Sequence, residues 1–363
     1  MTAPAIRIFG APARYIQGPF ALDLLGEAAA PFGSSPLVVA DAFILEHIGP
    51  RIEAVLSAAG LAPSIRAFSG EITYAAIDNL ADTLGGERPS VAIGVGGGKS
   101  LDAAKGLALK LDLDVITVPT IASNDSPTSA SIAMYDDHHV MVSVDRLKRN
   151  PQTVIVDTGL ISKAPAHFLR AGIGDAISKK FEADGCLAGT GFTPFGTRPL
   201  STAVAIADAC YRTLRENARD ALAAVEQGMV TPALEATVEA TVLMSGLGFE
   251  NGGLSLAHSL TRGLVKARDA RNAIHGAHVA WGLLVQLAAE GRSDGFIDDL
   301  AEFYAETGLP LRLCDLGMKN ASEAEIGDIV RWTMTAPHLA NFAVPVTPEL
   351  IVEAIRRIEK RPM

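Results

Sequence analysis

The sequence predicts two domains, an α/β nucleotide-binding domain over residues 1–160 and an all-helical domain over residues 161–363. In the first part, short apolar runs alternate with helix-like segments, which indicates a doubly wound parallel sheet. In the second part, amphipathic or buried helical segments follow one another, and no further strand is expected. Between a predicted strand and a predicted helix lies the glycine turn 94–98, and such turns hold phosphate groups in α/β proteins.

Length and composition fit this division and exclude several classes of protein. The chain has 363 residues, which is more than one hydrophobic core usually organises. Hydrophobic residues make up 48% and charged residues 20%, which argues against disorder. The net charge of −10 and the lack of a Lys/Arg run argue against nucleic acid as a partner. Three scattered cysteines and no signal or membrane segment predict a cytoplasmic protein without a membrane partner.

Five apolar runs predict the strands of the first domain, at 36–41, 64–68, 90–93, 114–119 and 153–157. Helices are expected at 20–29, at 71–84 and directly after the glycine turn, and a hairpin is expected over 132–144. Ligands of parallel sheets bind at the carboxyl ends of the strands. The glycine turn and Asp41 both follow strands, so they point to one binding site.

The glycine turn fits neither of two standard phosphate-binding patterns. A Walker A loop would need glycine at position 93, which is Ile93, and a dinucleotide fingerprint would need glycine or alanine at position 99, which is Lys99. Three consecutive glycines are entropically costly unless the backbone must approach something closely. We therefore expect a phosphate cradle of another kind, and a glycine turn without a ligand is the alternative.

Polar residues after two strands are candidates for binding a nucleotide and a substrate. Asp41 ends its strand, where it could accept hydrogen bonds from a ribose and favour NAD over NADP, or could cap the helix that follows. The segment 120–131 is dense in small hydroxyl groups and holds one acid, Asp125. Its hydroxyls could bind the cofactor and Asp125 a substrate hydroxyl, and a polar capping loop is the alternative.

The second domain is predicted to consist of helices with short connections, at 164–186, 200–216, 220–227, 231–246, 255–267, 277–290, 294–307 and 323–334. Three candidate metal ligands lie among small and apolar residues of these segments: Asp175, His258 and His275. Two imidazoles and one carboxylate leave a coordination position open, as catalytic zinc sites do. Each residue taken singly could instead be a satisfied core residue, and His278 competes with His275 for the ligand role.

The chain resembles the glycerol dehydrogenase branch of the group III (iron-containing-like) alcohol dehydrogenase family. The matching segments follow the family order over nearly the whole chain: RYIQG at 14–18, GGGKSLD at 96–102, PTIASND at 119–125, GIGDA at 172–176, GFE at 248–250, AHS at 257–259 and HG at 275–276.

This resemblance implies the dehydroquinate synthase-like fold, NAD as the cofactor, and a metal held by Asp175, His258 and His275. It implies substrate contact by Asp125 and a large homo-oligomer such as an octamer. The residues that it assigns to NAD are Asp41, Gly97, Gly98, Lys99, Ser100, Leu101, Asp102, Thr120, Ser123, Ser129, Ser131 and Tyr135.

The sequence departs from the family at several positions. Iron-using relatives have a histidine four residues after the aspartate, where this chain has Lys179, so a fourth protein ligand is not expected and Zn²⁺ is favoured over Fe²⁺. Ala277, His278, Asn124 and Trp281 also differ from the residues usual in the family. We expect these changes to lie close to the metal or the substrate, and to affect the choice of substrate.

The expected reaction is the reversible, metal-assisted oxidation of a vicinal diol by NAD, with glycerol and dihydroxyacetone as the leading pair. Another polyol or a 2-hydroxy acid is the first alternative. A sugar-phosphate lyase or cyclase is the second, because Lys266, Arg268 and Arg271 could bind a phosphate. A nucleotide-binding regulator without catalysis is the third, and it should lack the metal ligands.

Overall fold

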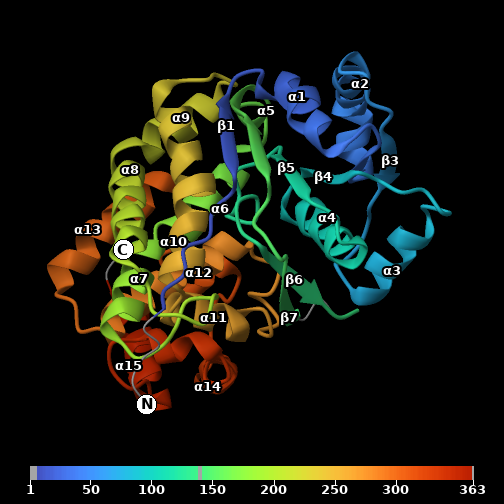
Figure 1. Ribbon diagram of the computed structural model, residues 1–363. Helices are drawn as coiled ribbons and strands as arrows, with labels where there is room; N and C mark the ends of the chain where they lie inside the picture. Colours follow the sequence, from blue (N-terminus) through green and yellow to red (C-terminus); the bar gives the residue numbers. More distant parts are fainter. Residues whose placement is uncertain (1–5, 138–140, 362–363) are drawn as a thin grey trace. The chain divides into compact units, whose positions relative to one another are not determined.

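The computed structural model describes residues 6–137 and 141–361, and these residues form two compact units (Figure 1). The sheet unit consists of residues 10–165 and 224–243. The helical unit consists of residues 166–223, of the chain from residue 244 onward and of the segment before residue 10. Residues 224–243, which lie inside the range expected to be the helical domain, therefore group with the sheet.

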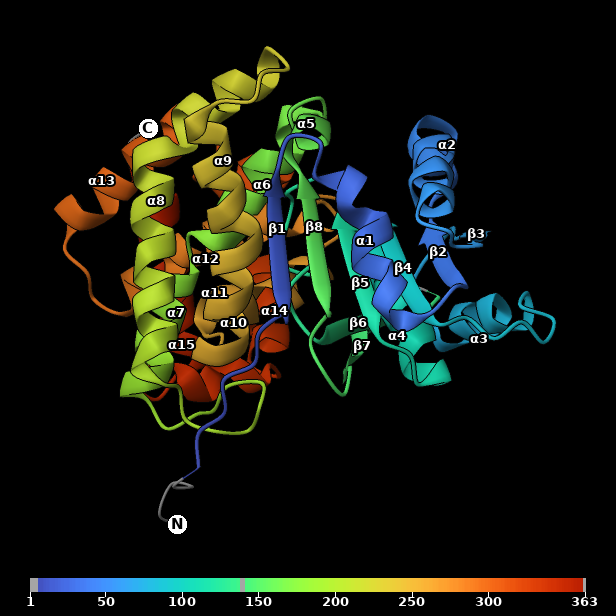
Figure 2. The same cartoon turned by 45° about the horizontal axis from the view of Figure 1, so that its top comes forward.

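The sheet unit is built on a sheet of parallel strands in the order β1-β8-β5-β4-β2-β3. The strands are β1 (Arg14–Gly18), β2 (Pro36–Ala40), β3 (Ser64–Ala67), β4 (Val91–Gly96), β5 (Val115–Pro119) and β8 (Thr153–Asp157). Every residue of β2, β4, β5 and β8 is buried, as in sheets covered on both faces. Figure 2 shows β1 beside β8; the sequence pattern did not predict β1, because an edge strand can be partly polar and exposed.

Helices cover both faces of this sheet, which confirms the doubly wound architecture. They are α1 (Leu25–Ala29), α2 (Ala42–Ala58), α3 (Tyr74–Asp82), α4 (Gly98–Leu111) and α5 (Thr158–Ile161), with the 3₁₀ turns η1 (Ala21–Leu24) and η2 (Ala30–Phe32). Val38 belongs to one core with Leu25 and Leu56 of the α1–α2 side. Its neighbour Val39 points to the other face and belongs to the core with Ile77 and Leu107 of the α3–α4 side.

The strand order places a topological switch point between β2 and β4. The chain leaves β2 for β3 on one side, and it leaves β4 for β5 on the other side. Open α/β sheets bind ligands at the carboxyl ends of the strands where the order reverses. Asp41 follows β2 and the glycine turn follows β4, so both lie at this point. As expected, β6 (Ser131–Tyr135) and β7 (Met141–Arg146) form an antiparallel pair.

The remaining helices follow the predicted segments, with several differences. They are α6 (Ala166–Ala176), α7 (Lys179–Ala188), α8 (Ser201–Glu226), α9 (Pro232–Val238), the π-helix η3 (Glu239–Met244), α10 (Ser245–Gly252), α11 (Leu256–Leu264), α12 (His275–Ala289), α13 (Asp294–Thr307), η4 (Leu313–Leu316), α14 (Glu323–Thr333), η5 (Pro337–Asn341) and α15 (Pro348–Glu359). The segment 164–186 is broken between α6 and α7, whereas 200–216 and 220–227 join as α8. The helix α15 was not predicted. Within the described ranges, no helix has the length and apolar character needed to cross a membrane.

Helix α12 is the central helix of the helical unit, and it packs against α6, α11 and α15. Two glycines let α6 and α12 approach with their backbones nearly in contact. A Cβ atom on Gly276 would lie 1.8 Å from the carbonyl oxygen of Ala171, and one on Gly174 would lie 2.5 Å from the carbonyl oxygen of Gly276. This close approach brings His275 at the start of α12 next to Asp175 near the end of α6.

We predict that Gly276→Ala destabilises the protein by about 3 kcal/mol or more, because the added methyl group meets a backbone oxygen that cannot move aside cheaply. Thermal unfolding should show a clearly lowered Tm. Gly327→Ala in α14 is the matched control, because nothing lies within 4 Å of the new Cβ atom and alanine favours a helix. Equal Tm values for the two variants would contradict the close packing of α6 on α12.

Candidate metal centre and phosphate cradle

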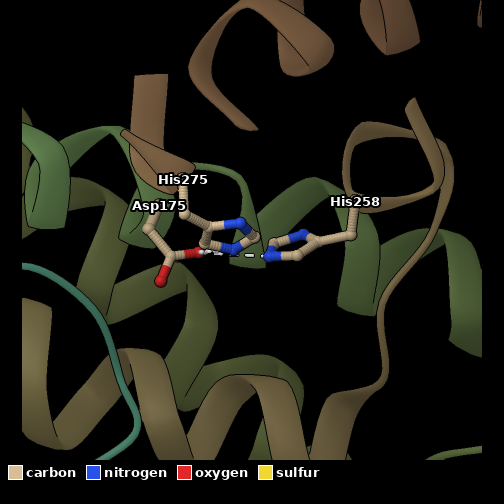
Figure 3. A group of neighbouring side chains, drawn as sticks. All are labelled: Asp175, His258 and His275. Atoms are coloured by element: carbon tan, nitrogen blue, oxygen red, sulfur yellow. Dashed lines mark hydrogen bonds and ion pairs between the residues drawn. The ribbon is translucent and has the colours of Figure 1, made fainter. Parts of the chain in front are cut away.

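Asp175, His258 and His275 converge in the helical unit, from α6, α11 and α12 (Figure 3). The Nε2 atom of His258 lies 3.1 Å from Oδ1 of Asp175, and Nε2 of His275 lies 4.0 Å from the same oxygen. One ligand atom from each residue lies within 4.8 Å of the other two. Asp175 is 1% exposed and His275 is 48% exposed at the side chain, so the group has one open side.

Glu182 holds His258 in the orientation that a metal ligand needs. Its Oε2 atom lies 2.6 Å from Nδ1 of His258, and its Oε1 atom accepts hydrogen bonds from the backbone N–H groups of Ser255 and His258. The other ring nitrogen of His258 therefore faces Asp175. A carboxylate behind a ligating histidine is the usual second layer of a metal site. The sequence analysis missed Glu182, because it stands in the charged segment 179–184 and no motif marks it.

Lys179 places its amine directly against two of the three candidate ligands. Its Nζ atom donates a hydrogen bond to Oδ1 of Asp175 at 2.6 Å and lies 3.1 Å from Nε2 of His258. The Lys179 side chain is 1% exposed. Position 179 was expected to contribute no ligand, yet its side chain reaches the centre, because a residue four positions after Asp175 lies on the same helical side even across the break between α6 and α7.

Burial and neighbouring charges shift the pKa values of the group. Burial opposes ionisation of Asp175, but Lys179 and the histidines hold its pKa well below its usual range. Burial likewise opposes ionisation of Glu182, and His258 overcomes it and lowers the pKa to about 2. Desolvation and Lys179 oppose protonation of His258, but the Glu182 carboxylate and the hydrogen bonds to Asp175 and Glu182 together raise its pKa. His275 is 48% exposed, but desolvation where its ring faces the centre, with the nearby His258 and Lys179, lowers its pKa to about 4 and favours the neutral imidazole that binds metals.

His278 and Trp281 take part in the packing of α12, and their closeness to the metal or the substrate stays a prediction. The Nε2 atom of the buried His278 lies 2.8 Å from the carbonyl oxygen of Ala270. Trp281 is fully buried and donates its indole N–H to Glu359 of α15. The structure thus brings His275, and not His278, together with Asp175. A further, half-buried histidine, His338 of η5, has its pKa lowered to about 4 by desolvation and then by His258.

The glycine turn of the sheet unit has the shape of a phosphate cradle. Gly96 has a φ of +135°, which L-residues with side chains rarely adopt, and Gly97 is the N-cap of α4. A Cβ atom on Gly98 would lie 2.8 Å from the amide nitrogen of Asn124. Because glycine has no side chain to cap the helix, the first turn of α4 can offer its N–H groups and its positive dipole end to an anion.

Asp41 is the N-cap of α2, which was one of its two predicted roles. Its Oδ1 atom accepts a hydrogen bond from the N–H group of Ile44 at 2.9 Å. Its second oxygen accepts a hydrogen bond from the hydroxyl group of Ser100 at 3.4 Å, so Asp41 adjoins the glycine turn. Thr120 reaches the same place by donating its N–H group to the carbonyl oxygen of Gly96. The contact of Asp41 with a ribose stays a prediction.

Lys105 of α4 fixes the hydroxyl-rich segment that carries Asp125. It is fully buried, and its Nζ atom donates to Oδ1 of Asp102, to both the carbonyl and hydroxyl oxygens of Ser126, and to the carbonyl oxygen of Ser131. Asp102 also accepts hydrogen bonds from the Ser126 hydroxyl and from the N–H group of Ala133. The carboxylate of Asp102 is thus bound within the protein, and its contact with a cofactor stays a prediction.

The other residues expected to bind a cofactor vary in their surroundings. The exposed Lys99 forms an ion pair with Glu71, whose side chain is 9% exposed, and Leu101 is buried in the core. Ser123 and Ser129 are buried, and desolvation raises the pKa of Tyr135 to about 12. Among the described residues, the buried hydroxyl group of Ser131 has no hydrogen-bond partner. A buried hydroxyl group without a hydrogen-bond partner destabilises the fold, and a polar ligand that bonds to it would remove this cost.

Comparisons with known proteins show which family the chain is related to. A sequence model of the family described as iron-containing alcohol dehydrogenase matches residues 12–158. The chain is 36% identical over 349 residues to the glycolaldehyde reductase of Halobacterium salinarum, with 96% of each chain covered. It is 39% identical over 351 residues to the glycerol dehydrogenase of Thermotoga maritima, again with 96% of each covered. The crystal structure of a probable glycerol dehydrogenase from Sinorhizobium meliloti superposes with a TM-score of 0.91 at 35% identity and 98% coverage of each chain.

We predict that Glu182→Gln weakens Zn²⁺ binding by about 10- to 100-fold, because the carboxylate that orients His258 is lost. Competition of the purified protein with a chromophoric chelator measures the change. Glu306→Gln, which alters a carboxylate paired with Arg219 on the surface, should bind Zn²⁺ like the wild type. Unchanged affinity in Glu182→Gln would contradict the supporting role.

We predict that Lys105→Met lowers the free energy of unfolding by about 3–5 kcal/mol, because it leaves the Asp102 carboxylate and two backbone oxygens without their buried partner. Denaturant unfolding measures this loss. Lys110→Met on the same helix removes only an exposed ion pair with Asp78 and should have little effect. A similar small effect in both variants would mean that Lys105 does not hold the segment.

Proposed function

The chain belongs to the iron-containing alcohol dehydrogenase family, and we propose that it uses NAD and a bound metal ion to interconvert a vicinal diol and an α-hydroxy carbonyl compound. The leading substrate pair is glycerol and dihydroxyacetone. The observation that carries this proposal is the convergence of Asp175, His258 and His275 on one open-sided centre. Relatives of similar identity act on small hydroxy compounds, by the names that they bear.

The residues of the centre fit a metal ion. Two imidazole nitrogens and a carboxylate oxygen are a known donor set for Zn²⁺ and Fe²⁺, and Glu182 orients one of the imidazoles. The metal would supply a Lewis acid that lowers the pKa of the substrate hydroxyl group. We favour Zn²⁺, because position 179 carries an amine where iron-using relatives have a third imidazole. The exposed side of His275 leaves room for the substrate oxygen.

The sheet unit is proposed to bind NAD. The N-terminus of α4 and the turn at Gly96–Gly98 would hold the pyrophosphate, and the unpaired hydroxyl group of Ser131 offers a further contact. The Asp41 carboxylate would accept hydrogen bonds from the ribose and repel a 2′-phosphate, which favours NAD over NADP. The nicotinamide accepts the hydride when it is bound.

Asp125 is proposed to hold the neighbouring hydroxyl group of the substrate and to take part in moving its proton. It lies in the segment that Lys105 fixes through Ser126, so its backbone is well positioned. A second hydroxyl next to the reacting carbon is shared by glycerol and by ethylene glycol, the product of reducing glycolaldehyde. The two relatives' names therefore describe the same bond change, and a diol is favoured over a simple alcohol.

We propose the cytoplasm as the site of action and a homo-oligomer as the working form. All three cysteines are free, two of them buried, which fits a reducing compartment. The homo-oligomer is proposed from the resemblance to the family. Size-exclusion chromatography with light scattering tests it.

The test is NADH formation by the Zn²⁺-loaded protein with glycerol, ethylene glycol, 1,2-propanediol, lactate and ethanol. We expect the diols to react and ethanol and lactate to react far more slowly. His258→Ala should lose at least about a thousandfold in kcat/KM, because a metal ligand is removed. His167→Ala, an exposed histidine of α6, is the control. Failure to oxidise any hydroxyl compound would overturn the dehydrogenase assignment, and activity in His258→Ala would overturn the ligand assignment.

A further inference from the structure

The amine of Lys179 lies inside the proposed metal centre, and this position carries a consequence for metal binding. Its side chain is 1% exposed, and its Nζ atom lies 2.6 Å from Oδ1 of Asp175 and 3.1 Å from Nε2 of His258. These are two of the three atoms that would bind the metal. The ring of Phe249 lies 5.9 Å from the same nitrogen, so part of the surroundings is apolar.

The chemistry of the two contacted atoms makes the amine and a metal ion compete. His258 has its Nδ1 atom against Glu182, which leaves its Nε2 atom for the centre. The Nε2 atom lies 3.1 Å both from Nζ of Lys179 and from Oδ1 of Asp175, and whether it accepts from the first or donates to the second, its lone pair is not free for a metal. Oδ1 of Asp175 accepts from Lys179 within the same small space, where a metal would sit about 2 Å from its ligands.

The charges of the centre give a buried lysine a role there. Asp175 and Glu182 are both buried carboxylates, and a buried carboxylate without a cation is strongly destabilising. Lys179 supplies that cation when no metal is bound. A divalent ion would do the same more strongly, and the ammonium group would then be a like charge beside it.

We propose that Lys179 is a built-in competitor for the metal, which neutralises Asp175 in the metal-free protein and must leave the centre when the metal binds. The lysine thus stabilises the metal-free fold and weakens metal affinity. This inference rests on the proposed function, since it concerns the same metal centre. It adds that the affinity is set by a residue that does not bind the metal.

The test compares wild type, Lys179→Gln, Lys179→Met and Lys180→Gln, with Zn²⁺ as the probe. Zn²⁺ affinity is measured by competition with a chromophoric chelator, and Tm is measured with chelator and with excess Zn²⁺. Lys180 is the matched control, because it is the next residue but pairs with Asp184 and Asp208 away from the centre. The glutamine variant keeps a donor for Asp175, so folding is preserved better than in the methionine variant.

Both Lys179 variants are expected to bind Zn²⁺ at least about tenfold more tightly than wild type, since one like charge is removed from the centre. Their Tm without metal should fall and the rise in Tm on adding Zn²⁺ should grow, whereas Lys180→Gln should match wild type. If a variant folds only with Zn²⁺, the enlarged metal-dependent rise in Tm supports the proposal.

Equal or weaker Zn²⁺ binding in the glutamine variant would overturn the proposal. The amine would then have no effect on Zn²⁺ affinity, or would increase it. Failure of the proposed function is distinguishable. In that case wild type and both variants bind no Zn²⁺ and wild type oxidises no diol. If wild type binds Zn²⁺ and oxidises diols but the variants' affinities are unchanged, only the inference about Lys179 fails.

Discussion

The Asp175 carboxylate, buried and surrounded by protein, is the constraint on which the helical unit depends. An ionised group in that position needs cations and hydrogen-bond donors close by. Lys179 of α7 and His258 of α11 supply them, and the neutral ring of His275 from α12 lies 4.0 Å from the same oxygen. Gly174 and Gly276 allow the close helix contact that this requires. The close contact of α6 and α12 therefore serves both the packing of the unit and the assembly of its centre.

The sheet unit holds a second buried lysine, and the comparison shows two different uses of one residue type. Lys105 contacts Asp102 and the oxygens of Ser126 and Ser131, which belong to a packed segment of the fold. None of these oxygens belongs to the proposed metal centre, so the role of Lys105 is structural and its hydrogen bonds are not exchanged for a metal. Lys179 instead contacts atoms that a metal would use, and its bonds are open to exchange. Both lysines are buried, so burial does not distinguish them. The atoms that each ammonium group contacts decide whether it has a structural role or can be replaced by a metal ion.

The secondary-structure elements of each site suit a different part of the proposed chemistry. The ends of β2, β4 and β5 and the start of α4 present backbone groups and a helix dipole, which suit a phosphate-bearing cofactor. The helical unit presents side chains at helix ends, which suit a metal and the substrate oxygen bound to it. The segment with Asp125 carries the carboxylate that is proposed to hold a second hydroxyl group of the substrate.

Much of the fold was determined by sequence patterns that act locally. The buried strands β2, β4, β5 and β8 are continuous apolar runs, and the glycine turn and the ligand residues stand out by residue type. Edge strand β1 and helix α15 escaped prediction, because a half-exposed element has a weak pattern. The break between α6 and α7 was not predicted either, since the segment there is uniformly helix-like.

What the tertiary structure alone decided is which distant residues meet. His275 was the ligand candidate by sequence and His278 its rival, and the packing of α12 turns His275 toward Asp175 and His278 toward Ala270. Glu182 and Lys105 had no motif to mark them, since their partners lie elsewhere in the chain. Lys179 was visible only as a missing histidine, and its amine was found in the centre because two helices meet there. The chemistry of a site built from separate helices depends on contacts that no local pattern encodes.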